Sequence, residues 1–237
     1  MFHDITAPYH FLESWLYDSA VAPAVAEMIG ERPAFFRKVL DAMPAEGSLL
    51  DVGCGGGHLL LDLARAHPGW RLTGLDLSAD QVRRAGKRAR ELAGRITFIT
   101  GSAQDLPFPD ASFDAVVSVC SIKHWPDALR GLSECLRVLR PGGVLVVAEV
   151  EREYDRRDRR AFIARQRVPL VLKPVACFGF AWKVAARSIT IREAVALFDS
   201  LPVTGIDASP VPGMPLWLVS AVKCARDQRR EKSRVAK

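Results

Sequence analysis

The sequence predicts an α/β fold built on a mostly parallel β-sheet, and two observations lead to this prediction. Short apolar runs alternate with segments of helical periodicity, so that five strand–helix repeats follow one another along the chain. The first apolar run, in residues 48–58, is closed by a cluster of glycines. The chain has 237 residues and is 49% apolar, which is enough for one sizeable α/β domain with its own core.

Residues 48–58 predict a buried strand, a tight glycine turn and the start of a helix. Glycines let the backbone adopt a positive φ and let a ligand approach the main chain closely. The free N–H groups at the helix start would face that ligand. The nicotinamide dinucleotide fingerprint requires Gly-x-Gly-x-x-Gly. Gly53 and Gly55 match its first two positions, but His58 stands at the third.

The glycine pattern is preceded by an acid, because the chain reads Asp51-x-Gly53-x-Gly55-x-Gly57. A carboxylate repels a pyrophosphate but attracts the ammonium group of an amino acid. The stretch resembles the first motif of class I S-adenosylmethionine-dependent methyltransferases, Asp/Glu-x-Gly-x-Gly-x-Gly. The resemblance implies that Asp51, Gly53, Cys54 and Gly55 bind this cofactor. A glycine-rich turn without a ligand is the alternative.

A second acid follows the next predicted strand, residues 71–76. Asp76 lies 23 residues after Gly53, where a βαβ fold places a carboxylate against ribose hydroxyls. Its two oxygens can accept both hydroxyl protons. The alternative role, a helix N-cap, suits Ser78 better because Ser78 directly precedes the helix. We therefore expect Asp76 and the adjacent Leu77 to contact the cofactor.

The segment after the third predicted strand, residues 95–100, reads Gly-Ser-Ala-Gln-Asp-Leu-Pro-Phe. It resembles the family's Gly-Asp-Ala-Glu-x-Leu-Pro-Phe segment, which holds the adenine. The resemblance implies adenine contacts from Ser102, Ala103 and Gln104. Ser102 replaces the family's aspartate, so it can accept a hydrogen bond only without charge assistance. A plain turn is the alternative.

The fourth predicted strand, residues 112–119, carries the Phe-Asp-x-Val-x-Ser pattern that is typical of the family. Cys120 begins the loop at its carboxyl end, where ligands of open α/β sheets bind, and is expected at the cofactor. His124 in the same loop is the candidate general base, because imidazole has an ordinary pKa of about 6.5. Alternatively, His124 and Trp125 pack the start of the helix that Pro126 opens.

The resemblance covers about residues 50–225 and implies a Rossmann-like class I methyltransferase fold. Its sheet has seven mostly parallel strands in the order 3-2-1-4-5-7-6, with strand seven antiparallel and helices on both faces. We expect a single domain over residues 1–225, followed by a basic tail at 226–237 that is expected to be disordered. Within the domain we expect a helical cover (1–47), a cofactor-binding core (48–150), a lid insertion (151–190), and a closing helix and strands (191–225).

The cover and the lid are the expected acceptor site. Tyr9 and Tyr17 belong to an aromatic cluster of the cover, and Phe178 and Trp182 belong to an apolar run of the lid. An apolar lid fits an apolar acceptor. The arginines at 156, 157, 159 and 160 would suit an anionic group on it. The alternative is that these aromatic residues pack on the core.

Charge and composition limit the classes of partner that the chain is expected to bind. The net charge is +6, but residues 151–237 carry 18 Lys+Arg against 9 Asp+Glu, so the basic charge lies in the C-terminal third. Such a surface suits anionic partners, including transient contact of residues 151–190 with a membrane surface. The chain has no Asn/Asp-Pro-Pro-Tyr/Phe tetrad and no aromatic stacking platform, so no nucleic-acid partner is expected.

Compartment and metal content are predicted from the same composition. No apolar N-terminal run follows a basic segment, and the longest apolar stretch, residues 168–186, is interrupted by Lys173, Pro174 and Lys183. Five scattered cysteines without Cys-x-x-Cys indicate reduced thiols in a cytoplasmic protein. The five histidines lack metal-ligand spacing, so no metal is expected.

The predicted function is methyl transfer from S-adenosylmethionine to oxygen, nitrogen or carbon of a small, apolar metabolite. The resemblance is greatest to the small-molecule branch that includes the ubiquinone and menaquinone C-methyltransferases. Two alternatives stay open: a non-catalytic protein of the same fold that binds the cofactor or a membrane, and a nicotinamide oxidoreductase. The sequence predicts neither the substrate nor the oligomeric state.

Overall fold

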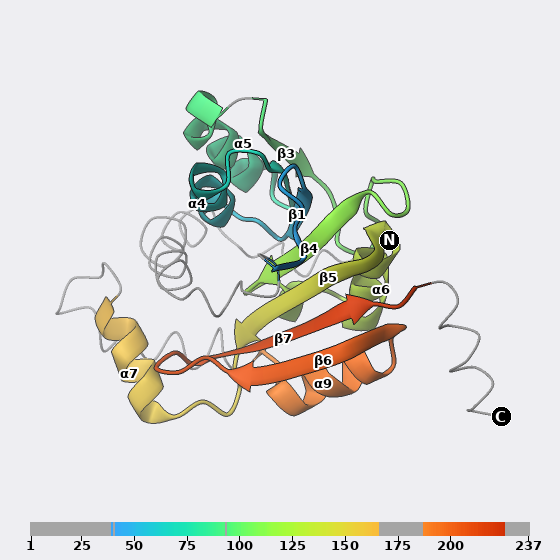
Figure 1. The fold of residues 1–237 in the computed structure, drawn as a ribbon. Helices are drawn as coiled ribbons and strands as arrows, with labels where there is room; N and C mark the ends of the chain where they lie inside the picture. Colours follow the sequence, from blue (N-terminus) through green and yellow to red (C-terminus); the bar gives the residue numbers. More distant parts are fainter. Residues whose placement is uncertain (1–38, 40, 93, 166–186, 226–237) are drawn as a thin grey trace.

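The computed structural model of the protein describes residues 39, 41–92, 94–165 and 187–225, which form one seven-stranded sheet and its covering helices (Figure 1). The strand order is β3-β2-β1-β4-β5-β7-β6, and β7 is antiparallel to both neighbours. The predicted order and the antiparallel strand are thus confirmed. The strands are β1 (Ser48–Val52), β2 (Arg71–Asp76), β3 (Ile96–Thr100), β4 (Phe113–Val119), β5 (Leu139–Val150), β6 (Val203–Pro210) and β7 (Leu216–Lys223).

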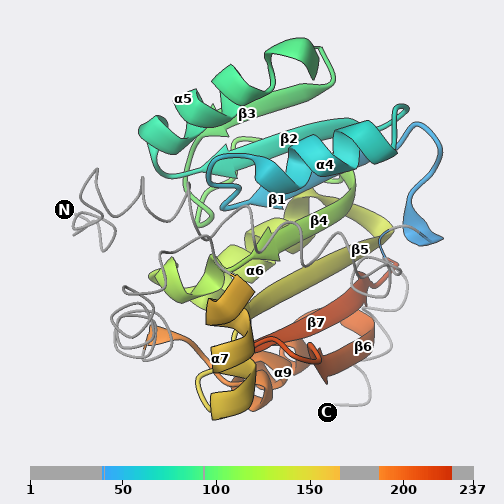
Figure 2. The same ribbon diagram turned by 90° about the vertical axis from the view of Figure 1, so that its left-hand side faces the viewer.

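Helices cover both faces of the sheet (Figure 2). The described helices are α4 (His58–Ala66), α5 (Ala79–Arg88), α6 (Ala128–Val138), α7 (Arg156–Arg165) and α9 (Ile191–Asp199), with short 3₁₀ turns η2 (Arg90–Leu92) and η3 (Ile122–His124). Helices α4, α5 and α7 lie on one face, and α6 and α9 lie on the other. None of the described helices is long and apolar enough to span a bilayer.

The alternation of strand side chains produces two core layers. Leu49 of β1 packs with Leu60 of α4, whereas the next residue, Leu50, packs with Leu132 of α6. Because both faces of the central strands are buried, these strands read as continuous apolar runs. The apolar runs in the sequence therefore mark the strands well.

Three predicted boundaries differ from the structure. From the sequence, Arg-Pro-Gly-Gly at residues 140–143 predicts a turn before a strand at 144–150. In the structure, β5 already begins at Leu139 and contains a bulge where its register against β4 shifts. Gly142 has φ +79°, and Gly143 lies close to the Asp114 carbonyl, so glycines here permit a bulge as well as a turn. The sequence pattern also predicts a charged helix at 151–167 and a helix at 80–92. The first begins only at Arg156, and the second divides into α5 and η2.

The parallel arrangement gathers the predicted site at one edge. In β1 and β2, Asp51 lies opposite Gly74 and Val52 opposite Leu75, so the two strands end together. The carboxyl end of β4 lies beside β1 on its other side. The loops after β1, β2 and β4 consequently meet at the same edge of the sheet, where open α/β sheets bind ligands.

Candidate functional site

The glycine loop after β1 requires glycine for two different reasons. Gly53, Gly55 and Gly57 all have positive φ, at 82°, 51° and 78°. A Cβ on Gly53 would lie 1.9 Å from Ser121 Oγ, and one on Gly57 would lie 2.7 Å from the Phe98 ring. A Cβ on Gly55 would meet nothing within 4 Å. Two glycines therefore permit close packing, and Gly55 leaves main chain open to a ligand.

Hydrogen bonds hold this loop in place. The N–H groups of Gly53 and Cys54 both donate to the Leu75 carbonyl, at 2.7 and 3.0 Å. The N–H of Gly55 donates to Asp76 Oδ2 at 2.8 Å. Since all three donors are bound within the protein, the loop has its shape before any ligand arrives. These three N–H groups are thus used for loop geometry.

Asp51, at the end of β1, is a buried carboxylate with a missing partner. Its residue is 3% exposed, and within the described part of the chain its Oδ1 atom has no hydrogen bond. Burial, and then the negative charge of Asp76, raise the pKa of Asp51 to about 8. A buried acid without a partner beside an open glycine turn fits a cationic group of a ligand.

Asp76, at the end of β2, has two main-chain partners. Its Oδ2 accepts from Gly55 N and its Oδ1 accepts from Ser78 N at 2.9 Å. Burial raises its pKa, and these two hydrogen bonds oppose that shift. Ser78 is the N-cap of α5, as expected, because its Oγ accepts from Gln81 N. Each oxygen of Asp76 keeps a second lone pair for a ligand hydroxyl. The adjacent Leu77 is 47% exposed.

The predicted adenine segment forms a tight turn after β3. Ser102 forms an isolated bridge with Asp105, and Ser102 Oγ accepts from Gln104 N at 3.1 Å. The Gln104 side chain points to α6, since its Nε2 donates to the Asp127 carbonyl at 2.6 Å. The N–H of Gln104 is therefore engaged inside the protein rather than offered to adenine. Ser102 and Ala103 are half-buried, and they remain the predicted adenine contacts of this segment.

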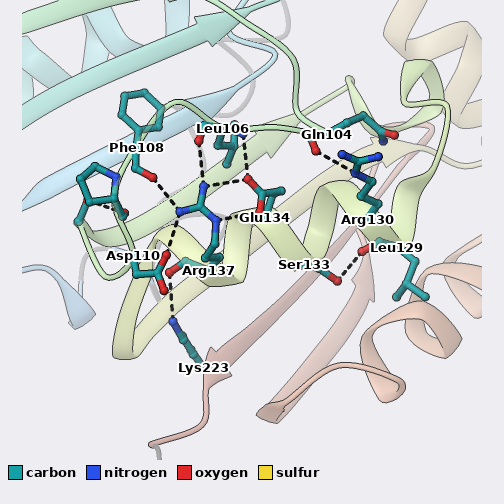
Figure 3. Close-up of polar contacts among 12 residues, drawn as sticks. Gln104, Leu106, Phe108, Asp110, Leu129, Arg130, Ser133, Glu134, Arg137 and Lys223 are labelled. Atoms are coloured by element: carbon teal, nitrogen blue, oxygen red, sulfur yellow. Dashed lines mark hydrogen bonds and ion pairs between the residues drawn. The ribbon is translucent and has the colours of Figure 1, made fainter. Parts of the chain in front are cut away.

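Polar side chains of α6 hold the rest of this loop by its main chain (Figure 3). Arg137 donates to the carbonyls of Leu106 and Phe108 at 2.8 and 2.7 Å, and also to Asp110 and Glu134. Glu134 in turn accepts from Leu106 N at 2.9 Å. Because these contacts are to main-chain atoms, they fix the loop's path largely independently of its side chains. Arg130 adds a bond to the Gln104 carbonyl at 3.0 Å.

The loop after β4 lies against the glycine loop. Cys120 has φ +55°, which is unusual for a residue with a side chain, and Ser121 packs on Gly53. His124 is half-buried in η3. Burial and the charges of Lys123 and Arg187 lower the pKa of His124 to about 3. Its imidazole is therefore neutral at pH 7, and its affinity for a proton is weak.

A family model described as a methyltransferase domain matches residues 50–147, which include the glycine loop, both carboxylates, the adenine segment and the β4 loop. Residues 50–147 therefore form a class I S-adenosylmethionine-dependent methyltransferase domain. The family model ends inside β5, so α7, α9 and the last two strands lie outside it.

The chain is also similar to curated methyltransferases. It is 37% identical over 188 residues to 2-methyl-6-phytyl-1,4-hydroquinone methyltransferase of Synechocystis, a match that covers 76% of this chain and 54% of the relative. It is 41% identical over 103 residues to 27-O-demethylrifamycin SV methyltransferase of Amycolatopsis mediterranei, covering 43% and 38%. The chain thus spans about half the length, or less, of these relatives.

Solved structures show the same fold at low identity. The plantazolicin methyltransferase, solved with a monoazolic desmethyl analogue and S-adenosylhomocysteine, has a TM-score of 0.68 at 16% identity, covering 93% of this chain and 92% of the other. A SAM-dependent methyltransferase from Aquifex aeolicus has a TM-score of 0.57 at 17% identity, covering 84% and 97%. These likenesses support the methyltransferase fold.

The structure brings the predicted core residues of the site together and adds others. Asp51, the glycines, Asp76 and the β4 loop share one edge, whereas Tyr9, Tyr17, Phe178 and Trp182 fall outside the described residues. No group of three or more His, Cys, Asp or Glu side chains in the described segments is placed to bind a metal. Sequence reasoning missed Lys123, Glu149 and the α6 arginines. The one available signal was a glutamate within the apolar run 144–150.

Proposed function

We propose that this chain binds S-adenosylmethionine at the glycine loop and transfers its methyl group to a small, apolar metabolite. One observation carries the proposal: the buried Asp51 and the half-buried Asp76 lie at the ends of neighbouring strands, next to the glycine loop in which a Cβ on Gly55 would meet nothing within 4 Å. An acid without a partner suits the ammonium of the cofactor's amino acid, and an acid with free lone pairs suits its ribose.

The chain's own residues bind and align the reactants. When bound, the cofactor supplies an electrophilic methyl group on a sulfonium. Asp51 would pair with the ammonium, Asp76 would accept from the ribose hydroxyls, and Ser102 and Ala103 would border the adenine. The prearranged loops hold these groups without reorganising during transfer. Much of the rate acceleration can then come from alignment and the exclusion of water.

The relatives support an apolar acceptor. Their printed names refer to a phytyl hydroquinone, a demethylrifamycin, a fatty acid and demethylmenaquinone. All of these acceptors have large apolar parts. An anionic group on the acceptor would find Arg156, Arg157 and Arg160 exposed on α7. We therefore propose an apolar phenol, hydroquinone or carboxylic acid as the acceptor class, with methylation at oxygen or carbon.

A transfer assay tests this function. The purified protein is incubated with S-adenosylmethionine carrying a labelled methyl group and, in separate reactions, a prenylated hydroquinone, a long-chain fatty acid and a hydrophilic catechol. Label should enter one of the first two, with one equivalent of S-adenosylhomocysteine per methyl transferred. The same reaction is repeated with a cell extract as the source of acceptors. If the protein binds the cofactor but transfers label neither to the three acceptors nor to anything in the extract, the result would support the non-catalytic alternative.

The predicted general base, His124, has a separate test. We expect His124→Gln to leave the shape of the kcat–pH profile unchanged between about pH 5 and pH 8, because a group with a pKa of about 3 does not titrate in this range. The profile is measured at saturating cofactor with the acceptor from the transfer assay. A kcat loss of at least about tenfold, together with the loss of an acidic limb, would instead establish His124 as the base. An unchanged profile would mean that His124 packs the start of the helix that Pro126 opens.

A further inference from the structure

Lys123 and Glu149 form an ion pair that is closed off from solvent at the carboxyl edge of the sheet. Lys123 Nζ lies 2.8 Å from Glu149 Oε1, and the two side chains are 4% and 0% exposed. Glu149 is the penultimate residue of β5, and Lys123 lies in η3 after β4. The pair joins the ends of two neighbouring strands at the edge that holds the glycine loop.

The pair is part of a set of hydrogen bonds that closes the β4 loop onto β5. Lys123 Nζ also donates to the Cys120 carbonyl at 2.6 Å. Glu149 accepts from the main-chain N–H of Lys123 at 3.3 Å and from that of Val150 at 2.7 Å. The lysine therefore secures one end of the loop, and the glutamate secures the turn that carries the lysine.

The loop that is held has an unfavourable backbone. Cys120 adopts the left-handed conformation, which a residue with a Cβ adopts only at a cost. Both of its main-chain groups are bonded, since its N–H donates to the Ala148 carbonyl at 2.8 Å and its carbonyl accepts from Lys123. The conformation of Cys120 places Ser121 against Gly53, and Ser121 Oγ accepts from Trp125 Nε1 at 3.0 Å.

Stability alone does not explain such a pair. Removing two charges from water costs about as much as their attraction returns, so apolar replacements of buried ion pairs are often neutral or stabilising. The burial of Lys123 also excludes it as a surface site for an anionic substrate. What the pair does is hold a strained loop against the glycine turn.

We propose that the buried Lys123–Glu149 pair is a positioning device, which fixes the loop of residues 120–125 against the glycine loop and so shapes one wall of the cofactor site. The inference rests on the proposed cofactor function. Lys123 and Glu149 are positioning residues rather than catalytic ones, because they act through Cys120 and Ser121. Loss of the pair should therefore affect cofactor affinity more than folding.

The test is the double variant Lys123→Met/Glu149→Gln, which removes both charges with little change in volume. Its Tm should stay within about 4 °C of the wild type, because no unpaired charge is left buried. Its affinity for S-adenosylhomocysteine, measured by calorimetry, should fall about tenfold, because the charged bond to the Cys120 carbonyl is lost. Lys123→Arg is a second variant that keeps the charge but not the short contacts, and it should also bind more weakly.

A matched control lies at the other end of the same two strands, where Arg140 pairs with Asp114. The double variant Arg140→Met/Asp114→Asn should keep its S-adenosylhomocysteine affinity within about twofold, since distant sites are nearly independent. Wild-type affinity in the folded Lys123→Met/Glu149→Gln variant, or in Lys123→Arg, would overturn the positioning role alone. A wild type that binds no S-adenosylhomocysteine would overturn the proposed function and this inference with it.

Discussion

Replacing Asp51 by asparagine is expected to make the protein more stable above pH 8 and a weaker binder of S-adenosylhomocysteine. Asp51 has a folded pKa of about 8, above its ordinary value of 3.8. Its contribution to stability is therefore full below pH 3.8 and is lost as the pH rises through 8, because the unfolded chain releases the proton more readily. Asparagine has no proton to lose, so Tm should rise in the variant at alkaline pH.

The affinity loss in Asp51→Asn should be about 1.5–3 kcal/mol, the size of a hydrogen bond to a charged group. Proton release from Asp51 on binding is a more specific measurement than the loss of affinity. At pH 7 most wild-type molecules carry the proton on Asp51, and pairing with the cofactor's ammonium would favour the carboxylate. Binding should thus release about one proton in the wild type and none in Asp51→Asn.

Calorimetry at pH 7 in two buffers with different ionisation enthalpies measures this release. The apparent binding enthalpy should depend on the buffer in the wild type, and the dependence should vanish in Asp51→Asn. Equal proton release in the two proteins would exclude Asp51 as the partner of the ammonium.

The second large effect is expected at the glycine loop. There Gly53→Ala should mainly destabilise the fold, whereas Gly55→Ala should mainly weaken cofactor binding. Gly53→Ala puts a methyl group 1.9 Å from Ser121 Oγ, so it should destabilise the fold by about 2–5 kcal/mol through strain and overpacking. Gly55→Ala meets nothing within 4 Å and should cost only the left-handed backbone, about 1–2 kcal/mol. Its methyl group would enter the space proposed for the cofactor, so affinity should fall strongly.

Gly142→Ala is the matched control for Gly55→Ala. Gly142 also has a positive φ, at 79°, and also has nothing within 4 Å of its Cβ position, but it lies in the bulge of β5. Chemical denaturation should give similar stability losses for the two variants, and titration with S-adenosylhomocysteine should separate them. If Gly55→Ala binds as tightly as Gly142→Ala, the cofactor does not approach the main chain at Gly55.

The sequence predicted those parts of the site that depend on local patterns. The strand, glycine turn and helix around Asp51 are encoded within residues 48–58, and Ser78 was recognised as a cap by its place before α5. The strand order came from the family resemblance, because periodicity does not specify which strands pair. The start of β5 was placed too late, since the glycines at 142 and 143 suit a bulge as well as a turn.

The missed residues share a physical cause. Lys123 and Glu149 are 26 residues apart, and nothing local shows that they are paired. Arg137 reaches main-chain atoms, which leave no mark in the sequence of the loop that it holds. The N–H of Gln104, a residue that the resemblance places at the adenine, is bonded to the nearby Ser102 hydroxyl. Competition between a ligand and a neighbouring side chain for one donor is decided only in the folded chain.

Binding of S-adenosylmethionine through Asp76 at the glycine loop is tested most directly by titrating the wild type and Asp76→Ala with S-adenosylhomocysteine and with NADH. The wild type should bind S-adenosylhomocysteine and not NADH. Asp76→Ala should weaken that binding by about 1.5–3 kcal/mol, because the ribose acceptor and the anchor of Gly55 are both lost. Binding of NADH by the wild type, or unchanged S-adenosylhomocysteine affinity in Asp76→Ala, would contradict the proposed site.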